Sequence, residues 1–285
     1  MFSINRLKLI LLPGMSIFLL IVIGLTGCSQ AAVPAGNGLI ELRGTINEAG
    51  STSVQPLAEM MAKAFMQKYP DVTVNISGGG SSAGVKAVAA GTVDIGAVSR
   101  EILINEPDLI TYCIARDGVA IVVHESNALT GINIENVAKI YAGEITNWKE
   151  VGGADERIVV ISREEGSGTR EVFDEFVIKP YHKKIKAGAL FFDSNGAIRT
   201  KVSSEKNAIG YLSFGYIEGL KPLMLNNVAP TVENVQNGRY PIVRRLYFIT
   251  KNIPSEPVRS FIDYCRSNEG QKIVESQGYI PIVKK

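Results

Sequence analysis

The stretch from Ser162 to Arg170 constrains the fold of this 285-residue chain more than any other segment. It follows an apolar, β-branched run at Ile158–Ile161 and precedes an amphipathic segment at Glu171–Val177. This order predicts a strand, a glycine-containing turn and the start of a helix. The turn carries two hydroxyls and a guanidinium beside the N–H groups of a helix N-terminus, and this combination attracts an anion.

Two other turns carry the same chemistry, at Gly50–Ser53 and at Gly78–Gly84. Each combines glycine with Ser or Thr ahead of a helix, and helix capping alone would explain any one of them. In open α/β sheets, ligands bind beyond the carboxyl ends of strands, where such turns lie. Three turns, together with Arg163 and the strand end at Ser99, therefore favour one shared oxyanion site.

The remaining pattern is that of an α/β protein. Apolar residues from Val54 to Tyr69 recur at helical spacing, with Thr52 or Ser53 as the natural N-cap. Apolar strands are predicted at Val72–Ile76, Val93–Val98 and Val119–Val123. Strands that alternate with helices indicate sheets that are at least partly parallel.

The N-terminus has the features of a signal peptide. Arg6 and Lys8 precede an apolar stretch at Leu9–Leu25, which is followed by Thr26-Gly27-Cys28. Residues 1–27 are predicted to be removed, with Cys28 lipidated as the new N-terminus and residues 28–41 acting as a tether. An uncleaved membrane anchor is the alternative. Both place the remainder on the outer face of the cytoplasmic membrane, periplasmic or extracellular.

Charge and cysteine usage exclude several classes of function. Removal of residues 1–27 takes away two basic residues, so the remaining Lys and Arg equal the 28 Asp and Glu. A formally neutral protein is not expected to bind nucleic acid. Cys113 and Cys265 could form a disulfide or remain buried thiols. The two histidines and these cysteines lack ligand spacing, so we expect neither a metal site nor a cofactor.

A serine hydrolase is the competing interpretation. Gly80–Gly84 fits the G-x-S-x-G nucleophile elbow, with Ser82 as the nucleophile. The required acid and base would come from Asp94 or Asp117 with His124 or His182. However, His182 lies in a basic stretch typical of a solvated loop, and His124 follows a strand as an ordinary rim histidine would. We therefore rank this interpretation second, and expect no enzymatic activity.

Several motifs together resemble one known family, the phosphate-binding lipoproteins that serve ABC-type phosphate importers. The resemblance extends from about Gly44 to Ile282. The motifs that carry it are Gly-Ser-Thr-Ser-Val-Gln-Pro at 50–56, Gly-Gly-Gly-Ser-Ser-Ala-Gly at 78–84, Val-Asp-Ile-Gly-Ala-Val-Ser-Arg at 93–100, Gly-Glu-Ile-Thr-Asn-Trp at 143–148, the segment Arg163–Arg170, and Gly-Tyr-Ile-Pro at 278–281.

The resemblance implies two α/β lobes of the periplasmic-binding-protein fold, joined by two crossing strands, with a ligand cleft between them. Lobe 1 would be residues 42–121 plus 246–285, and lobe 2 residues 122–245. It also implies a monomeric receptor that gives inorganic phosphate to the transmembrane subunits of an importer. The residues implied as phosphate contacts are Thr52, Ser53, Ser81, Arg163, Ser167, Gly168 and Thr169.

One departure from the family bears on the choice of ligand. Well-known members have an aspartate where this chain has Ser99, and that carboxylate accepts the proton of hydrogen phosphate and so rejects sulfate. Asp117 is the candidate substitute here, although it could equally be a turn residue before Gly118. Sulfate or another tetrahedral oxyanion therefore remains an alternative ligand. Arg100 is expected to pair with a carboxylate.

Overall fold

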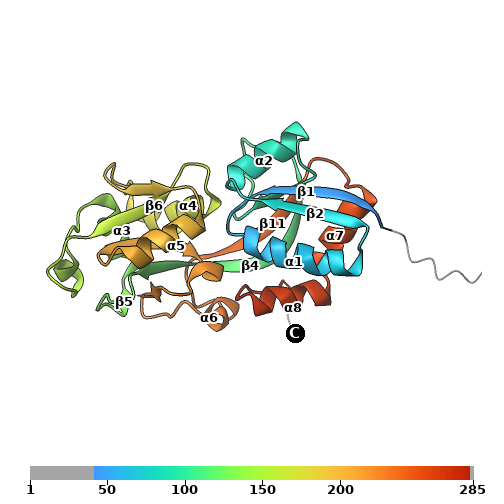
Figure 1. Cartoon of the computed structure of the whole chain (residues 1–285). Helices are drawn as coiled ribbons and strands as arrows, with labels where there is room; N and C mark the ends of the chain where they lie inside the picture. Colours follow the sequence, from blue (N-terminus) through green and yellow to red (C-terminus); the bar gives the residue numbers. More distant parts are fainter. Residues whose placement is uncertain (1–41, 283–285) are drawn as a thin grey trace, which may run out of the picture. The chain divides into compact units, whose positions relative to one another are not determined.

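The computed structural model describes residues 42–282 as a mixed α/β protein (Figure 1). Its strands are β1 (Gly44–Gly50), β2 (Val72–Ser77), β3 (Ile95–Val98), β4 (Ile110–Val123), β5 (Gly131–Ile132), β6 (Val159–Arg163), β7 (Leu190–Phe192), β8 (Ala208–Ser213), β9 (Lys221–Pro222), β10 (Met224–Leu225) and β11 (Val243–Thr250). Its helices are α1 (Gln55–Lys68), α2 (Ser81–Ala90), α3 (Ile134–Ala142), α4 (Gly168–Phe173), α5 (Asn195–Ser204), α6 (Val232–Gln236), α7 (Glu256–Arg266) and α8 (Asn268–Ser276).

The strands pair in the order β2-β1-β3-β11-β4-β8-β6-β7, with β9 also paired to β4. The two ends of this order are parallel, as βα crossovers require, because β1 pairs in parallel with β2 and β3, and β6 with β7 and β8. The middle is antiparallel, where β11 pairs with β3 and β4, and β4 with β8. Two parallel βα systems are thus connected through the long strands β4 and β11.

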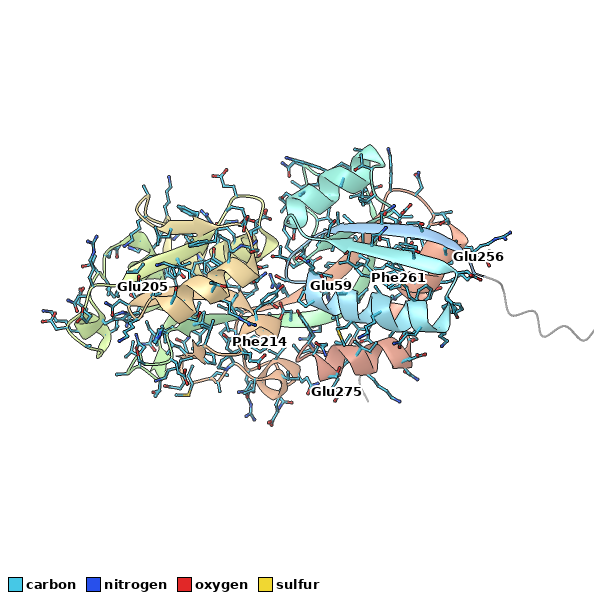
Figure 2. The ribbon with its side chains drawn as sticks, viewed as in Figure 1. Glu59, Glu205, Phe214, Glu256, Phe261 and Glu275 are labelled. Carbon is cyan, nitrogen blue, oxygen red and sulfur yellow. The ribbon has the colours of Figure 1, made fainter. Side chains whose placement is uncertain are left out.

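The apolar side chains form two large cores, and these define the two lobes. The core of lobe 1 draws on residues between 42 and 115 and between 246 and 279. The core of lobe 2 draws on residues between 119 and 242, with Ile280. Figure 2 places Phe261 in lobe 1 and Phe214 where the lobes meet. The predicted two-lobed α/β fold with two crossing strands is confirmed.

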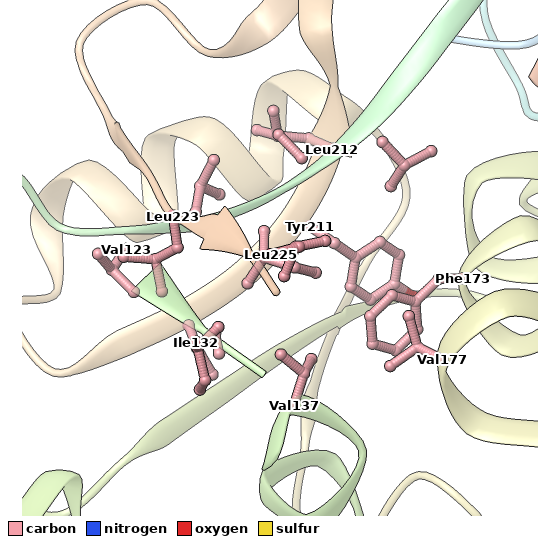
Figure 3. Close-up of a cluster of buried hydrophobic side chains, with 14 of the residues drawn as sticks. Val123, Ile132, Val137, Phe173, Val177, Tyr211, Leu212, Leu223 and Leu225 are labelled. Atoms are coloured by element: carbon pink, nitrogen blue, oxygen red, sulfur yellow. The ribbon is translucent and has the colours of Figure 1, made fainter. Parts of the chain in front are cut away.

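The core of lobe 2 holds the turn before α4 in position (Figure 3). The rings of Phe173 and Tyr211 stack with centroids 3.9 Å apart, and the ring of Tyr141 packs against both. The hydroxyl of Tyr211 accepts the backbone N–H of Arg163 at 3.1 Å, at the carboxyl end of β6. The aromatic core therefore fixes the strand end from which the organising turn starts.

The predicted signal peptide (residues 1–27), the lipidation site Cys28 and the tether up to residue 41 lie outside the described residues. Among residues 42–282, no helix combines the length and the apolar character needed to cross a membrane.

The core of lobe 1 contains an unusual carboxyl group, that of Glu48 on β1. Its side chain is buried, and neither carboxyl oxygen has a hydrogen-bond partner among the described residues. Burial, with a smaller contribution from the charge of Glu59, raises the pKa of Glu48 well above its usual value. The ionised form is therefore disfavoured in the folded state.

We expect Glu48→Met to stabilise the protein at neutral pH by about 1–3 kcal/mol, because it removes an unpaired buried polar group. The folded-state pKa is raised above the unfolded value of about 4.3, so the destabilisation by Glu48 grows as pH rises above that value. Urea denaturation near pH 4.5 and near pH 7.5 measures the difference. Glu48→Gln, which keeps the shape but cannot ionise, is the control and should abolish the same pH dependence. An equal gain in the free energy of unfolding of Glu48→Met at both pH values would contradict this account.

Candidate functional site

A buried ion pair lies where the two crossing strands meet. The register of β11 against β4 sets Arg244 directly opposite Asp117. The guanidinium donates from Nε and Nη2 to Asp117 Oδ2 at 3.0 and 2.7 Å. Both side chains are almost fully buried, with exposed fractions of 2% and 0%. The pair joins the two strands that connect the lobes.

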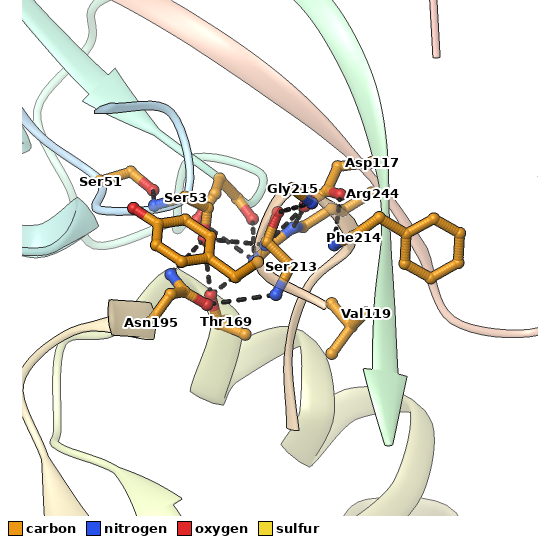
Figure 4. A network of polar contacts seen from close by, with 12 residues as sticks. Ser51, Ser53, Asp117, Val119, Thr169, Asn195, Ser213, Phe214, Gly215 and Arg244 are labelled. Atoms are coloured by element: carbon orange, nitrogen blue, oxygen red, sulfur yellow. Dashed lines mark hydrogen bonds and ion pairs between the residues drawn. The ribbon is translucent and has the colours of Figure 1, made fainter. Parts of the chain in front are cut away.

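The other N–H groups of Arg244 reach hydroxyls of both lobes (Figure 4). Nη1 donates to Thr169 Oγ1 of lobe 2 at 2.8 Å and to Ser99 Oγ of lobe 1 at 3.3 Å. Nη2 donates to Ser53 Oγ of lobe 1 at 2.8 Å. One guanidinium thus joins three hydroxyls that are far apart in sequence. Ser53 and Ser99 follow strands β1 and β3, and Thr169 lies at the start of α4.

Direct contacts between the lobes complete this cluster. Ser53 Oγ lies 2.9 Å from Thr169 Oγ1. Asn195, the first residue of α5, donates from Nδ2 to Thr52 Oγ1 at 3.0 Å and to Ser53 Oγ at 2.9 Å. Its own Oδ1 accepts the N–H of Ser213 at 3.1 Å, which fixes the orientation of the amide.

The second glycine-rich turn enters the same cluster through Ser81. The hydroxyl of Ser81 accepts the N–H of Ser99 at 3.1 Å and lies 3.3 Å from the hydroxyl of Ser99. A Cβ added to Gly168 would lie only 2.3 Å from Ser81 Oγ and 2.7 Å from Ser99 Oγ. Position 168 therefore has to be glycine for α4 of lobe 2 to approach these serines of lobe 1.

The first turn differs from the expectation that Thr52 or Ser53 caps α1. Val54 occupies the N-cap position, and no side-chain hydrogen bond caps the helix. The prediction was wrong because Ser51 supplies the acceptors in this turn. Its Oγ accepts the N–H of Ser53, and its carbonyl oxygen accepts the N–H of Val54. The hydroxyls of Thr52 and Ser53 are thereby left to join the interlobe cluster.

Two tyrosine hydroxyls donate hydrogen bonds to backbone carbonyl groups of this turn. The hydroxyl of Tyr216 donates to the carbonyl oxygen of Thr52 at 2.8 Å, and that of Tyr279 to the carbonyl oxygen of Ser53 at 2.9 Å. Burial raises the pKa of Tyr216 to about 12 and that of Tyr279 further. Both phenols remain protonated donors at neutral pH.

In the third turn, Ser167 caps α4 by accepting the N–H of Arg170 at 3.2 Å. Arg163 is 1% exposed, and its hydrogen-bond partners differ from those of Arg244. Its Nε and Nη2 donate to Glu164 and to the carbonyl oxygens of Phe192 and Asp193. Its Nη1, also buried, has no partner among the described residues.

The carboxylate of Asp117 forms its close contacts with other groups of the protein. Oδ2 accepts two N–H groups of Arg244, and Oδ1 accepts the N–H of Phe214 at 3.2 Å. The side chain of Ser213 is a further hydrogen-bond partner. Burial raises the pKa of Asp117, while the charge of Arg244 and its hydrogen bonds oppose that rise. In this arrangement Arg244, rather than the carboxylate, faces the hydroxyls of the interlobe cluster.

Arg100 pairs with carboxylates, as expected. It lies 2.6 Å from Glu106 of its own lobe and 2.7 Å from Glu171 of lobe 2, so it forms a second link between the lobes. Burial raises the pKa of Glu171, and the charge of Arg100 opposes that rise. Nη2 of Arg100 also donates to Ser82 Oγ at 3.0 Å.

No catalytic triad is assembled around Ser82 among the described residues. Its hydroxyl contacts Arg100, and neither histidine forms a hydrogen bond with it. His124 instead contacts Ser126 at 2.8 Å through Nδ1. The carboxylate of Asp94 accepts the N–H of Asn47. The geometry does not favour the hydrolase interpretation.

Cys113 and Cys265 are free thiols, the first half-buried and the second buried. Burial raises the pKa of both. Within residues 42–282, no three His, Cys, Asp or Glu side chains are grouped so that they could hold a metal ion.

Comparison with known proteins identifies the family. The model of the PBP superfamily domain matches residues 40–269, and the chain belongs to this family. The phosphate-binding protein PstS of Bacillus subtilis is 31% identical over 288 aligned residues, covering 98% of this chain and 94% of the relative. PstS of Borreliella burgdorferi is 31% identical over 246 residues, covering 82% and 88%.

Solved structures agree with these relatives. A phosphate ABC transporter substrate-binding protein from Clostridium perfringens, solved with bound phosphate, has a TM-score of 0.81 at 39% identity, covering 84% of this chain and 100% of that one. An ABC-type phosphate transport receptor from Vibrio cholerae has a TM-score of 0.68 at 31% identity, covering 82% and 99%. The resemblance to phosphate-binding proteins of ABC importers is confirmed.

Proposed function

We propose that this protein captures inorganic phosphate outside the cytoplasm and delivers it to the transmembrane subunits of an ABC importer. The observation that carries the proposal is the cluster of Ser53, Thr169, Ser99 and Arg244, in which hydroxyls of both lobes converge on one guanidinium. Relatives named for phosphate binding and transport, similar over most of the chain, support the same ligand.

In the proposed complex, phosphate oxygens replace the hydroxyl-to-hydroxyl bonds between the lobes. Thr52, Ser53 and Ser81 would donate from lobe 1, and Ser167, Gly168 and Thr169 would bind from lobe 2. Arg163 would donate through its unpartnered Nη1 and Arg244 through Nη1 and Nη2. Hydrogen bonds to a charged group contribute roughly 1.5–3 kcal/mol each, so these donors suffice without a basic surface.

The proton of hydrogen phosphate needs an acceptor, and Ser99 Oγ lies in the cluster where the ligand would sit. Asp117 would act mainly through Arg244, whose guanidinium it orients. A hydroxyl accepts or donates, whereas a carboxylate only accepts, so Ser99 rejects a proton-free anion less strongly. We therefore propose phosphate as the ligand, with sulfate as a weaker alternative.

The finer organisation belongs to the same proposal. Lobe 1 at 42–121 plus 246–285 and lobe 2 at 122–245 would close by a hinge motion in β4 and β11. The protein would act as a monomeric, non-enzymatic receptor, attached to the outer face of the membrane by a lipid on Cys28. Mass spectrometry of the protein from membranes, with Cys28→Ala as control, tests the lipid.

Replacement of Arg163 by alanine tests the site. We expect the dissociation constant for phosphate to rise by about 10- to 150-fold, the equivalent of one or more charge-assisted hydrogen bonds from Nη1. Calorimetric titration measures the change. Arg157→Ala is the matched control, because Arg157 is an exposed arginine of the same lobe. Normal phosphate binding by the Arg163 variant would show that the site is misplaced.

A further inference from the structure

The two crossing strands carry a second basic group on the face turned away from the interlobe cluster. In the register of β11 against β4, Arg245 lies opposite Arg116, one step from the pair of Arg244 and Asp117. Successive side chains of a strand point to opposite faces. Arg116 and Arg245 therefore share the face that is opposite to the proposed phosphate site.

These two arginines line a pocket of about 490 Å³. The residues that line it are Glu101, Cys113, Arg116, Val243, Arg244, Arg245 and Ile282. Its volume falls in the range of small-molecule sites, roughly 300–1,000 Å³, and it is larger than one tetrahedral anion requires. The pocket thus has room for an organic ligand.

The positive charge of the pocket is poorly compensated. Arg116 is half-buried and has no side-chain hydrogen bond or ion pair within residues 42–282. Arg245 approaches Glu101 only to 3.8 Å, with both side chains more than half exposed, and such a pair contributes little. The side-chain hydrogen bond of Arg245 with Tyr247 is to a hydroxyl, which carries no compensating charge at neutral pH. Glu101 is also engaged by the hydroxyl of Tyr247 at 2.8 Å. The charge of Arg244 is already neutralised by Asp117.

Like charges at directly opposed strand positions destabilise a sheet. An anion bound between Arg116 and Arg245 would be attracted to both guanidinium groups and would offset their mutual repulsion. Each guanidinium can bind carboxylate or phosphoryl oxygens in bidentate geometry. We propose that this pocket is a second anion site. It binds a small organic or condensed polyanion that bears carboxylate or phosphoryl groups, and it does so independently of phosphate between the lobes.

Titration of the purified protein with citrate and, separately, with pyrophosphate tests the proposal, at constant ionic strength because surface charges are screened by salt. Each titration is made with and without saturating inorganic phosphate. We expect at least one probe to bind under both conditions. Arg116→Gln and Arg245→Gln should each weaken that binding by about tenfold, the equivalent of one charge-assisted bond. The double variant should bind neither probe, and both single variants should bind phosphate as the unaltered protein does.

Arg259→Gln is the matched control, because it removes an exposed arginine of α7 outside the pocket, and it should leave probe binding within twofold. Binding of citrate alone would assign the carboxylate class of ligand, and binding of pyrophosphate alone would assign the phosphoryl class. Binding that phosphate displaces, binding that survives in the double variant, or absence of binding by both probes would overturn the proposal. Since the arginine dependence is measured without phosphate as well, this outcome is distinguishable from a failure of the proposed phosphate function.

Discussion

Replacement of Gly168 by alanine is expected to weaken phosphate binding by about 10- to 100-fold or more, at little cost to folding. The added Cβ would lie 2.3 Å from Ser81 Oγ and 2.7 Å from Ser99 Oγ, so the lobes could not reach the closed arrangement without strain. The clash involves one residue of lobe 2 and two of lobe 1, whereas each lobe keeps its own core. Alanine is also a better helix former than glycine at the start of α4.

Calorimetric titration with phosphate measures this effect, and thermal unfolding without ligand checks the fold. Gly188→Ala in the same lobe is the matched control, because a Cβ at that position meets no atom within 4 Å. We expect the control to bind phosphate normally. Phosphate affinity within threefold of the unaltered protein in the Gly168 variant would show that the lobes do not close on the ligand as proposed.

Replacement of Asp117 by alanine is expected to lower the free energy of unfolding by about 3–5 kcal/mol, because it leaves the buried Arg244 without its counter-charge. The lost contacts are two hydrogen bonds from the guanidinium, one from the N–H of Phe214 and one with the side chain of Ser213. Since the pair joins β4 to β11, the arrangement of the strands between the lobes depends on it. Urea denaturation followed by circular dichroism measures the loss.

The double variant Asp117→Leu, Arg244→Met distinguishes the effect of the unpaired buried charge on stability from the effect of lost packing. Replacing a buried pair by apolar residues of similar volume is often neutral or stabilising, so we expect much of the stability to return. Phosphate binding should not return, because Arg244 is absent. A loss below about 1 kcal/mol in Asp117→Ala would contradict the role of this pair.

The βα periodicity and the glycine-rich turns are local signals, and they predicted an α/β fold with partly parallel sheets. The division into two lobes was implied by the resemblance to the phosphate-binding lipoproteins. The sequence also indicated that turns distant along the chain meet, and the structure places Ser53, Ser81, Ser99 and Thr169 in one cluster. Their binding of phosphate stays a prediction, as do the predicted roles of Arg163 and Asp117.

The contributions of Arg244 and Asn195 to the cluster were missed for a physical reason. Neither residue belongs to a glycine-rich turn, and α5, which Asn195 starts, has a polar sequence with weak helical periodicity. Arg244 acquires its place through pairing of β11 with β4, more than 100 residues earlier in the chain. Such long-range register is set by tertiary packing and has no local sequence signal.

The length of β4 was underestimated for a related reason. An unbroken apolar run predicted a strand only at Val119–Val123, whereas β4 begins at Ile110. Arg116 and Asp117 interrupt the apolar pattern because they lie between Ala115 of one core and Val119 of the other, where the strand passes through a polar junction. The segment whose pattern fails carries Asp117, which orients Arg244, and Arg116 of the proposed second anion site.

A crystal structure of the protein grown with inorganic phosphate tests the central claim most directly. We predict one phosphate between the lobes, within hydrogen-bond distance of Ser53 from lobe 1, Thr169 from lobe 2 and Arg244 from the crossing strand. Phosphate bound to one lobe alone, or at a position that leaves the contact between Ser53 and Thr169 unchanged, would contradict the account.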